Sequence, residues 1–190
     1  MDNKAFLTPY FEAYAQNLIN DEVMGWIGAY ADLARGVRDN GKKMMFAGNG
    51  ASASIAEHGA VDFTKQGGVR GITFHDPNLM TCFANDFGYD HWVAKAVEHY
   101  ADPGDAVVLI STSGESPSVV NAARTAREMG LKVVTFTGRH ADNTLKSLGD
   151  VSFWVPSHAY NLVENLHAIW LTATIDLIIG KAEYETRAIV

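Results

Sequence analysis

From residue 42 onward, short apolar runs alternate with longer segments in which apolar residues recur at helical spacing. The runs expected to form strands are 44–47, 69–74, 106–110, 131–137 and 151–155, and the helical segments are 52–65, 79–86, 91–100, 117–129 and 161–180. This alternation predicts an α/β fold with five parallel strands and helices on both faces of the sheet. In folds of this kind, ligands bind beyond the carboxyl ends of the strands.

Two further helical patterns occupy residues 5–38, and both carry enough apolar side chains to pack on a large surface. The first is expected either to cover the core or to make an oligomer contact. The segment 161–180 is apolar around most of its circumference, which is typical of a buried helix and in a small protein favours packing between subunits. We therefore predict a single domain over 1–190, with a helical segment at 1–40 and an α/β core at 42–180.

The bulk composition restricts the class of function. Of the 190 residues, 47% are hydrophobic, and the formal net charge of −7 argues against binding to nucleic acid or to an anionic membrane. Cys82 is the only cysteine, which excludes an intramolecular disulfide and suits a reducing cytoplasm. No signal peptide is expected after Met1, and Thr172, Thr174 and Asp176 make the longest apolar stretch too polar for a membrane span.

Two loops of small and hydroxyl-bearing residues follow two of the expected strands. The first is Gly48–Ser54 (GNGASAS) and the second is Ser111–Ser116 (STSGES). A small-residue loop between a strand and the start of a helix leaves backbone N–H groups free beside the hydroxyls, and this arrangement favours an anion. Two such loops in one chain predict a phosphorylated ligand.

The first loop does not match a nucleotide-binding motif. It lacks the third glycine of the dinucleotide fingerprint, no acidic residue closes the second strand at the expected distance, and no Gly-Lys-Ser/Thr follows it. We therefore expect no nucleotide cofactor. In the second loop, Ser116 is followed by Pro117, a pair that is also typical of a helix N-cap, so a structural role for Ser116 stands beside the phosphate-binding one.

The order of motifs along the chain resembles that of one family. G-N-G-x-S-A at 48–53, a helix carrying His58, A-N-D-F-G at 84–88, S-T-S-G-x-S at 111–116 and a long C-terminal helix are similar to the SIS (sugar isomerase) domain family. Within it, the chain most resembles the phosphoheptose isomerase branch. The resemblance implies a five-stranded parallel sheet, a homotetramer, conversion of sedoheptulose 7-phosphate to a heptose phosphate, and zinc at the active site in several members.

The resemblance also implies which residues contact the substrate. The phosphate contacts would be Ser52, Ser111, Thr112, Ser113 and Ser116, the sugar would be lined by Asn49 and Gly50, and Asn85 and Asp86 would reach the sugar hydroxyls. From the residues alone, Asn85 and Asp86 could also form a turn at the end of a helix, because Asn and Asp favour such positions.

Isomerisation needs a base near the carbon that loses a proton, and an acid or a metal near the oxygens. The resemblance implies His and Glu four residues apart on the helix after the first loop, and here these are His58 and Asp62. It also implies Gln and, eight residues later, His on the last helix, where this chain has Glu164 and Thr172.

Thr172 is a poor acid and a poor zinc ligand, so the site would need another histidine. His167 follows Glu164 by one helical turn and could complete a catalytic and metal-binding set of His58, Asp62, Glu164 and His167. The alternative is that His167 is a hydrogen-bonded histidine within an apolar helix.

Two functions remain open from the sequence. The first is an aldose–ketose isomerase that acts on a phosphorylated sugar, with sedoheptulose 7-phosphate as the expected substrate. The second is a phosphosugar-binding protein without catalysis, either a sensor or a scaffold, because a non-catalytic branch of the family that associates with the bacterial replication initiator also lacks the final histidine.

Overall fold

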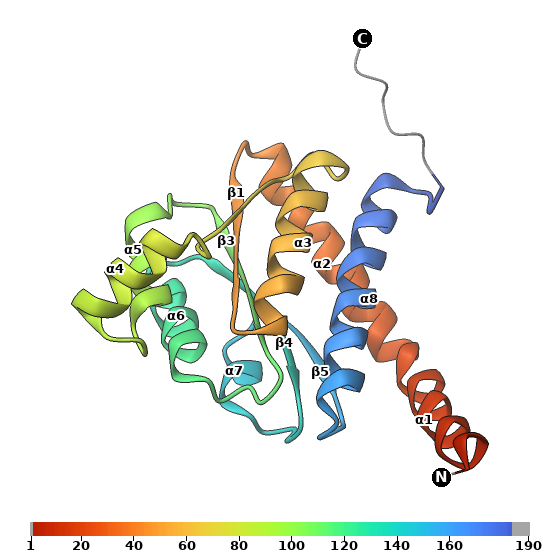
Figure 1. Ribbon diagram of the computed structural model, residues 1–190. Coiled ribbons are helices and arrows are strands. Elements are labelled where there is room, and N and C mark those ends of the chain that lie inside the picture. The colour runs from red at the N-terminus through yellow and green to blue at the C-terminus, as the bar shows by residue number, and fades with distance from the viewer. Residues whose placement is uncertain (1, 184–190) are drawn as a thin grey trace.

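A central parallel sheet lies between two layers of helices in the computed structural model, which describes residues 2–183 (Figure 1). The strand order is β2-β1-β3-β4-β5, and every neighbouring pair is parallel. The strands are β1 (Lys43–Gly48), β2 (Arg70–Thr73), β3 (Ala106–Ser111), β4 (Lys132–Gly138) and β5 (Val151–Val155). The predicted α/β fold with five parallel strands is therefore confirmed. The predicted domain range also includes residues 1 and 184–190, which lie outside the described residues.

One face of the sheet is covered by α2 (Asp21–Asp39), α3 (Ala51–Lys65) and α8 (Tyr160–Ile179). Aromatic rings dominate the core on this side. Phe136 of β4 stacks on Phe153 of β5 at 4.2 Å between ring centroids, and Tyr30 of α2 contacts both rings. Because α2 places Tyr30 in this core, the helical segment at 1–40 is partly built into the α/β core.

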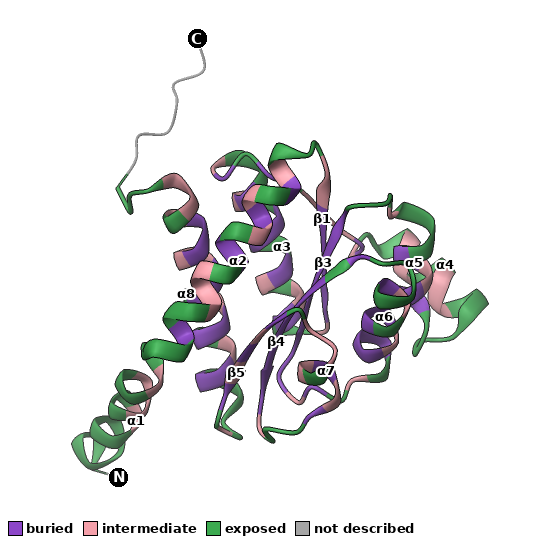
Figure 2. Ribbon diagram, turned by 180° about the vertical axis from the view of Figure 1, so that it is seen from behind, coloured by how far each residue is buried: buried purple, intermediate pink, exposed green. Residues whose placement is uncertain are grey.

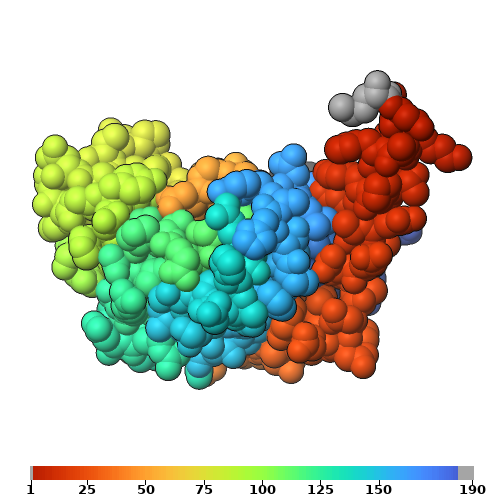
Figure 3. Space-filling model, turned by 90° about the horizontal axis from the view of Figure 1, so that it is seen from below, coloured from red at the N-terminus to blue at the C-terminus, as the bar shows by residue number. Residues whose placement is uncertain are grey.

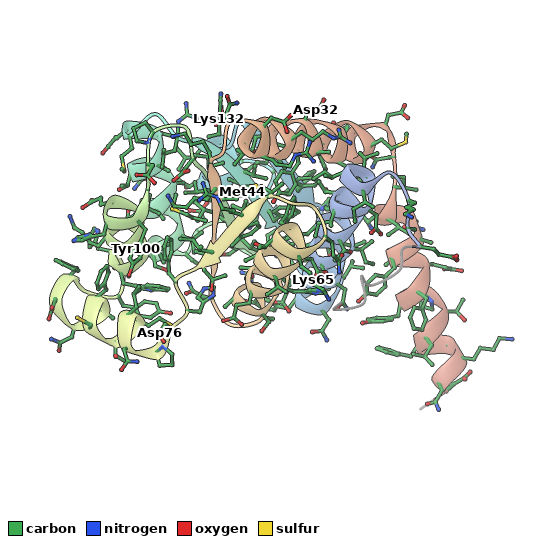
Figure 4. All side chains as sticks on the ribbon, turned by 90° about the horizontal axis from the view of Figure 1, so that it is seen from above. Asp32, Met44, Lys65, Asp76, Tyr100 and Lys132 are labelled. Atoms are coloured by element: carbon green, nitrogen blue, oxygen red, sulfur yellow. The ribbon has the colours of Figure 1, made fainter. Side chains whose placement is uncertain are left out.

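The other face is covered by helices from the middle of the chain. They are α4 (Pro77–Phe87), α5 (Trp92–Tyr100), α6 (Pro117–Glu128) and the short α7 (Thr144–Ser147). Seen from above, Met44 lies centrally, while Asp76 and Tyr100 mark α4 and α5 at one side of the molecule (Figure 4). The fully buried Trp92 is the largest side chain of this second core.

Several helices begin where a side chain caps free backbone N–H groups. Asn20 accepts a hydrogen bond from the Val23 N–H at the start of α2 (2.9 Å). Asp76 accepts from two N–H groups at the start of α4, where Pro77 occupies the first helical position. Such caps explain why helices start at these residues.

The first helix, α1 (Asn3–Leu18), extends away from the rest of the molecule and has no buried residue (Figure 2). It is attached through Tyr14, whose hydroxyl donates to the Asn161 carbonyl (3.2 Å), and through the Leu18 carbonyl, which accepts from the Trp170 indole (2.8 Å). Phe6 and Phe11 remain 57% and 62% exposed. A role of α1 in an oligomer therefore stays a prediction, although these rings give it the apolar surface that such a contact needs.

The last helix, α8, packs along the first core. Eight of its residues are buried in its own chain, and Ile169 and Leu177 point outward. The length of α8 and its mean hydropathy (1.4) would be sufficient for a helix that crosses a membrane, whereas its polar residues had predicted a segment too polar to do so. A core helix can have the same length and hydropathy, and 44% of that stretch is buried here.

The main difference from the predicted elements is the short helix α7, which the sequence pattern did not indicate. Asn143 caps it by accepting from the Lys146 N–H (3.0 Å). The other elements differ from the predicted ranges only at their ends. His91, for example, is the residue before α5 and not part of it.

Candidate phosphosugar site

The two small-residue loops lie side by side because β1 and β3 are neighbours in the sheet, with Gly48 paired to Ile110. From β1 the chain continues through α3 to one edge of the sheet, whereas from β3 it continues through α6 toward the other edge. This is the switch point of a doubly wound sheet, where ligands bind. Gly48 is required there, because a Cβ atom on it would lie 2.7 Å from the Ser52 carbonyl carbon.

A cavity of about 200 Å³ opens between these loops and the start of α8. The orange start of α3, the green second loop and the blue start of α8 meet in the middle of this side of the molecule (Figure 3). The cavity is lined by Asn49, Ser52, Ile110, Ser111, Thr112, Ser113, Ser116, Tyr160 and Glu164. All five predicted phosphate contacts are therefore brought together around one cavity.

Hydroxyl groups face one another within the second loop. Ser111 Oγ donates to Ser116 Oγ (3.1 Å), and Ser113 Oγ accepts from the Glu115 N–H (3.1 Å). The Thr112 hydroxyl is buried and has no hydrogen-bond partner in the structure. Buried polar groups are nearly always paired, so this unpaired hydroxyl beside the cavity is an exception.

Ser116 precedes α6 as expected, with Pro117 at the first helical position. Its side chain makes no capping hydrogen bond and instead accepts from Ser111. The hydroxyl therefore contributes to the cavity, while Pro117 fixes the backbone at the start of the helix.

The second loop is braced by α7. Gly114 has φ +68°, and a Cβ atom on it would lie 2.0 Å from Asn143 Oδ1. Asn143 is 2% exposed and donates to the carbonyl of His140 (2.8 Å). Glu115 accepts from both the N–H and the hydroxyl of Thr144, at 2.7 and 2.8 Å. These contacts hold the loop against a segment that sequence reasoning missed.

Asn49 in the first loop is fixed at both ends of its amide. Its Oδ1 accepts from the hydroxyl of Tyr89 (3.0 Å), and its Nδ2 donates to Ser118 Oγ (3.1 Å). Gly50 is exposed and forms the N-cap of α3. Tyr89 was not among the expected site residues. Its position directly after the A-N-D-F-G motif was the available signal.

Asn85 and Asp86 do not line the cavity. Both are exposed in the last turn of α4, where the Asn85 amide donates to Asp86 Oδ1 (2.8 Å). The helix ends at Phe87, and Gly88 follows with φ +82°. The alternative prediction for Asn85 and Asp86 was a turn at the end of a helix, and they do lie at the end of α4. Contact between these residues and a sugar stays a prediction.

His75 follows the end of β2 by two residues, and its Nε2 lies 3.1 Å from the Gly48 carbonyl oxygen. Its side chain is 5% exposed, and its Nδ1 lies 3.6 Å from Glu57 Oε1. Burial lowers the pKa of His75, although Glu57 and the Gly48 carbonyl act in the opposite direction. The imidazole therefore contacts the backbone at the start of the first loop and neither faces solvent nor lines the cavity.

His58 and Asp62 contact each other on α3, with Nε2 3.0 Å from Oδ2. The His58 side chain is 60% exposed and that of Asp62 is 20% exposed. From Ser52, Asp62 lies about 15 Å farther along the helix axis, since a helix rises about 1.5 Å per residue. Burial raises the pKa of Asp176 on α8, and the nearby charge of Asp62 raises it further. Acidic groups of α3 and α8 therefore lie close together beyond the cavity.

The structure does not place His167 with these groups. It is completely buried, and its Nε2 lies 2.9 Å from the Thr137 carbonyl oxygen. Burial lowers the pKa of His167 to about 4. Thr172 donates its hydroxyl to the carbonyls of Ala168 and Ile169 within the same helix. The prediction that His167 belongs to the catalytic and metal-binding set is therefore wrong, because His167 lies on the face of α8 that packs on the sheet.

The remaining residues do not fit a zinc site within one chain. Among residues 2–183, no three His, Cys, Asp or Glu side chains lie close enough together to hold a metal ion. Glu164 lines the cavity, whereas His58 and Asp62 are not among its lining residues. A structural zinc site takes four ligands and a catalytic one takes three plus water. Within residues 2–183, His58, Asp62 and Glu164 therefore do not form a complete zinc site in one chain.

Comparison with known proteins agrees with this geometry. The family model of the SIS domain matches residues 10–138. A phosphoheptose isomerase of Aliarcobacter butzleri is 36% identical over 137 residues, covering 69% of this chain and 72% of the relative. One from Mycobacterium bovis is 33% identical over 179 residues, covering 85% of each.

A solved structure gives the same result for the fold. The phosphoheptose isomerase of Neisseria gonorrhoeae superposes with a TM-score of 0.81 at 29% identity, covering 92% of this chain and 96% of that one. Similarity of this extent in both sequence and fold confirms the resemblance that the motifs indicated. The chain belongs to the SIS domain family, in its phosphoheptose isomerase branch.

Proposed function

We propose that this chain is an aldose–ketose isomerase that converts sedoheptulose 7-phosphate to a heptose 7-phosphate. The observation that carries the proposal is the cavity at the switch point, where four hydroxyls of the second loop and Ser52 converge and the Thr112 hydroxyl has no partner. A phosphate held there would accept hydrogen bonds from these hydroxyls and would lie near the positive end of the α3 dipole. The relatives from Aliarcobacter butzleri and Mycobacterium bovis are named phosphoheptose isomerases, which is the activity proposed here.

The sugar end of the ligand would extend along α3 from this anchor. In this pose, Glu164 is the first carboxylate at the cavity, and the His58–Asp62 pair lies farther along the helix. We assign Asp62 as the base that removes a proton from the carbon next to the carbonyl and returns it to the former carbonyl carbon, with His58 holding its carboxylate in position. Glu164 would exchange a proton with the sugar oxygens.

The test is incubation of the purified protein with sedoheptulose 7-phosphate, with and without added zinc, followed by detection of the aldose product. Formation of product in either condition supports the proposal, and its absence in both contradicts it. Zinc itself remains a prediction from the family resemblance, and metal analysis of the purified protein tests it separately.

A second candidate function has one specific observation in its favour. Thr172 stands where the resemblance implies a histidine, and its hydroxyl donates into its own helix. A protein with the phosphate site but without this acid would bind phosphosugars without turnover, as a sensor or as a scaffold for a replication initiator. Thermal stabilisation by sedoheptulose 7-phosphate without product would favour this alternative.

We further propose that the protein is a cytoplasmic homo-oligomer, with a tetramer as the expected form. The exposed rings of Phe6 and Phe11 and the outward Ile169 and Leu177 support assembly through α1 and α8. Asn85 and Asp86 would then approach a ligand only if assembly brings α4 of one copy to the cavity of another. Light scattering coupled to size-exclusion chromatography measures the mass that decides this point.

A further inference from the structure

Arg139 has an unusual backbone for its residue type. It follows β4, and it is the only non-glycine residue within 2–183 that has a positive φ (58°). Its N–H donates to the Ser157 carbonyl (3.0 Å), and the N–H of Gly138 donates to the Thr112 carbonyl (3.0 Å). A left-handed arginine is less stable than a glycine would be at the same position, and such outliers concentrate at functional sites.

The side chain of Arg139 contacts a residue of the cavity. Its guanidinium carbon lies 4.7 Å from the centre of the Tyr160 ring. Tyr160 is 57% exposed and lines the cavity together with Glu164. The Arg139 Nε atom is buried and makes no hydrogen bond. The cation is therefore held by the ring and not by a carboxylate.

The charge of the cavity lining indicates a role for the contact between Arg139 and Tyr160. No lysine or arginine is among the described residues that line it, and its one charged group, Glu164, is an acid. A phosphate dianion entering the cavity would meet hydroxyl dipoles and a carboxylate of like charge. A cation in contact with the cavity wall would offset that repulsion.

We propose that Arg139 and Tyr160 act together as a phosphate-selecting pair, in which Arg139 positions the Tyr160 ring at the cavity and supplies the positive charge that the lining lacks. The proposal rests on the phosphate site of the proposed function but not on turnover. In this proposal the left-handed backbone of Arg139 directs its side chain to Tyr160, which accounts for a strained arginine directly after β4.

The test measures the affinity of inorganic phosphate and of sedoheptulose 7-phosphate by calorimetry for four variants. Arg139→Gly is expected to weaken both about tenfold at low ionic strength, and less at high salt, because a charge is lost. Its melting temperature should equal or exceed that of the unsubstituted protein, since glycine adopts the positive φ without strain. Tyr160→Leu should weaken binding similarly, and the double variant should bind no more weakly than either single one.

Arg124→Gln is the matched control, because it removes one positive charge from an exposed position on α6 that does not line the cavity. It should leave both affinities unchanged. If the unsubstituted protein turns over its substrate, Arg139→Gly should raise KM while leaving kcat within twofold, as expected for a binding contact.

The outcomes separate the two proposals. If the unsubstituted protein binds neither ligand, the phosphate site and this inference both fail. If it binds them and Arg139→Gly binds equally well, only the inference fails. A loss of affinity in Arg139→Gly that does not depend on salt, or that adds fully to the loss in Tyr160→Leu, also contradicts the pair.

Discussion

Two regions of the molecule differ in the contacts that hold their side chains in place. One is the second loop, and the other is the outer face of α3 and α8, which carries His58, Asp62 and Thr172. The loop from Ser111 to Ser116 is tied by hydrogen bonds to α7, and its glycine fits closely against Asn143. On the outer face, His58 and Asp62 contact each other, and the Thr172 hydroxyl bonds only within its own helix. The hydroxyls proposed to bind phosphate are therefore held in place within one chain, whereas the His58–Asp62 pair assigned to catalysis lies on a helix surface that other contacts would have to complete.

The comparison predicts that binding and turnover can be separated by substitution. Asp62→Asn keeps the size of the side chain and can still contact His58, but it cannot accept a proton from carbon. We expect turnover to fall by about 10² to 10⁴-fold, as for loss of a general base, with phosphosugar affinity within a few-fold. Steady-state kinetics and calorimetry measure the two quantities.

Asp32→Asn is the control for charge, because Asp32 is 79% exposed on α2 and pairs with Arg35. It should change neither quantity. If Asp62→Asn retains turnover, the base lies elsewhere on the molecule, and the outer face of α3 loses its assigned role.

The bracing of the second loop predicts a large effect at Gly114. In Gly114→Ala, the positive φ costs about 1–2 kcal/mol, and the collision with Asn143 adds about 1–3 kcal/mol. Phosphate binding should be lost with this stability, because the loop must move. Urea unfolding and calorimetry with inorganic phosphate give both numbers.

Gly130→Ala separates strain from collision. Gly130 has φ +73°, but a Cβ atom on it would meet nothing within 4 Å. This variant should lose about 1–2 kcal/mol through strain alone and should bind phosphate normally. Equal losses in the two variants would show that α7 does not brace the loop.

The site could be predicted from sequence where its chemistry is local. The five proposed phosphate contacts lie in two short motifs and line one cavity, because adjacent parallel strands bring such motifs together at one edge of the sheet. The brace from Asn143 could not be predicted, because Asn143 lies 29 residues beyond Gly114 and the contact depends on how the chain after β4 folds back.

His167 shows a second limit. It lies three residues after Glu164, and such neighbours are close on a helix surface. Since α8 is apolar around most of its circumference, its sequence did not show which side faces the sheet. The buried residues of α8 include His167 but not Glu164, so the two side chains lie on either side of the boundary between core and cavity.

The core position of His167 predicts a dependence of stability on pH. Above pH 6.5 the histidine is neutral in both the folded and the unfolded chain, so it carries no penalty. Between pH 6.5 and about 4 the unfolded chain binds a proton that the buried imidazole does not, and the free energy of unfolding falls by up to about 3 kcal/mol.

His167→Gln tests this assignment, because the Gln amide can still donate to the Thr137 carbonyl but does not titrate. The loss of stability between pH 7.5 and pH 4.5, measured by urea unfolding, should be smaller in the variant. An unchanged loss, or a loss of turnover without a change in pH dependence, would return His167 to the site.

The smallest effect is expected for Thr112→Val, which removes a single hydroxyl from the second loop. In the unliganded protein the Thr112 hydroxyl is already without a partner, so its removal should change the free energy of unfolding by less than about 1 kcal/mol. Phosphate affinity should fall about tenfold, because the ligand loses one hydrogen bond from a buried donor. Thr174→Val is the control, since the buried Thr174 hydroxyl donates to the Trp170 carbonyl (2.8 Å) and lies away from the cavity. It should lower stability by about 1 kcal/mol and leave phosphate affinity unchanged. The reverse pattern in the two variants would mean that the cavity at the switch point does not receive the phosphate.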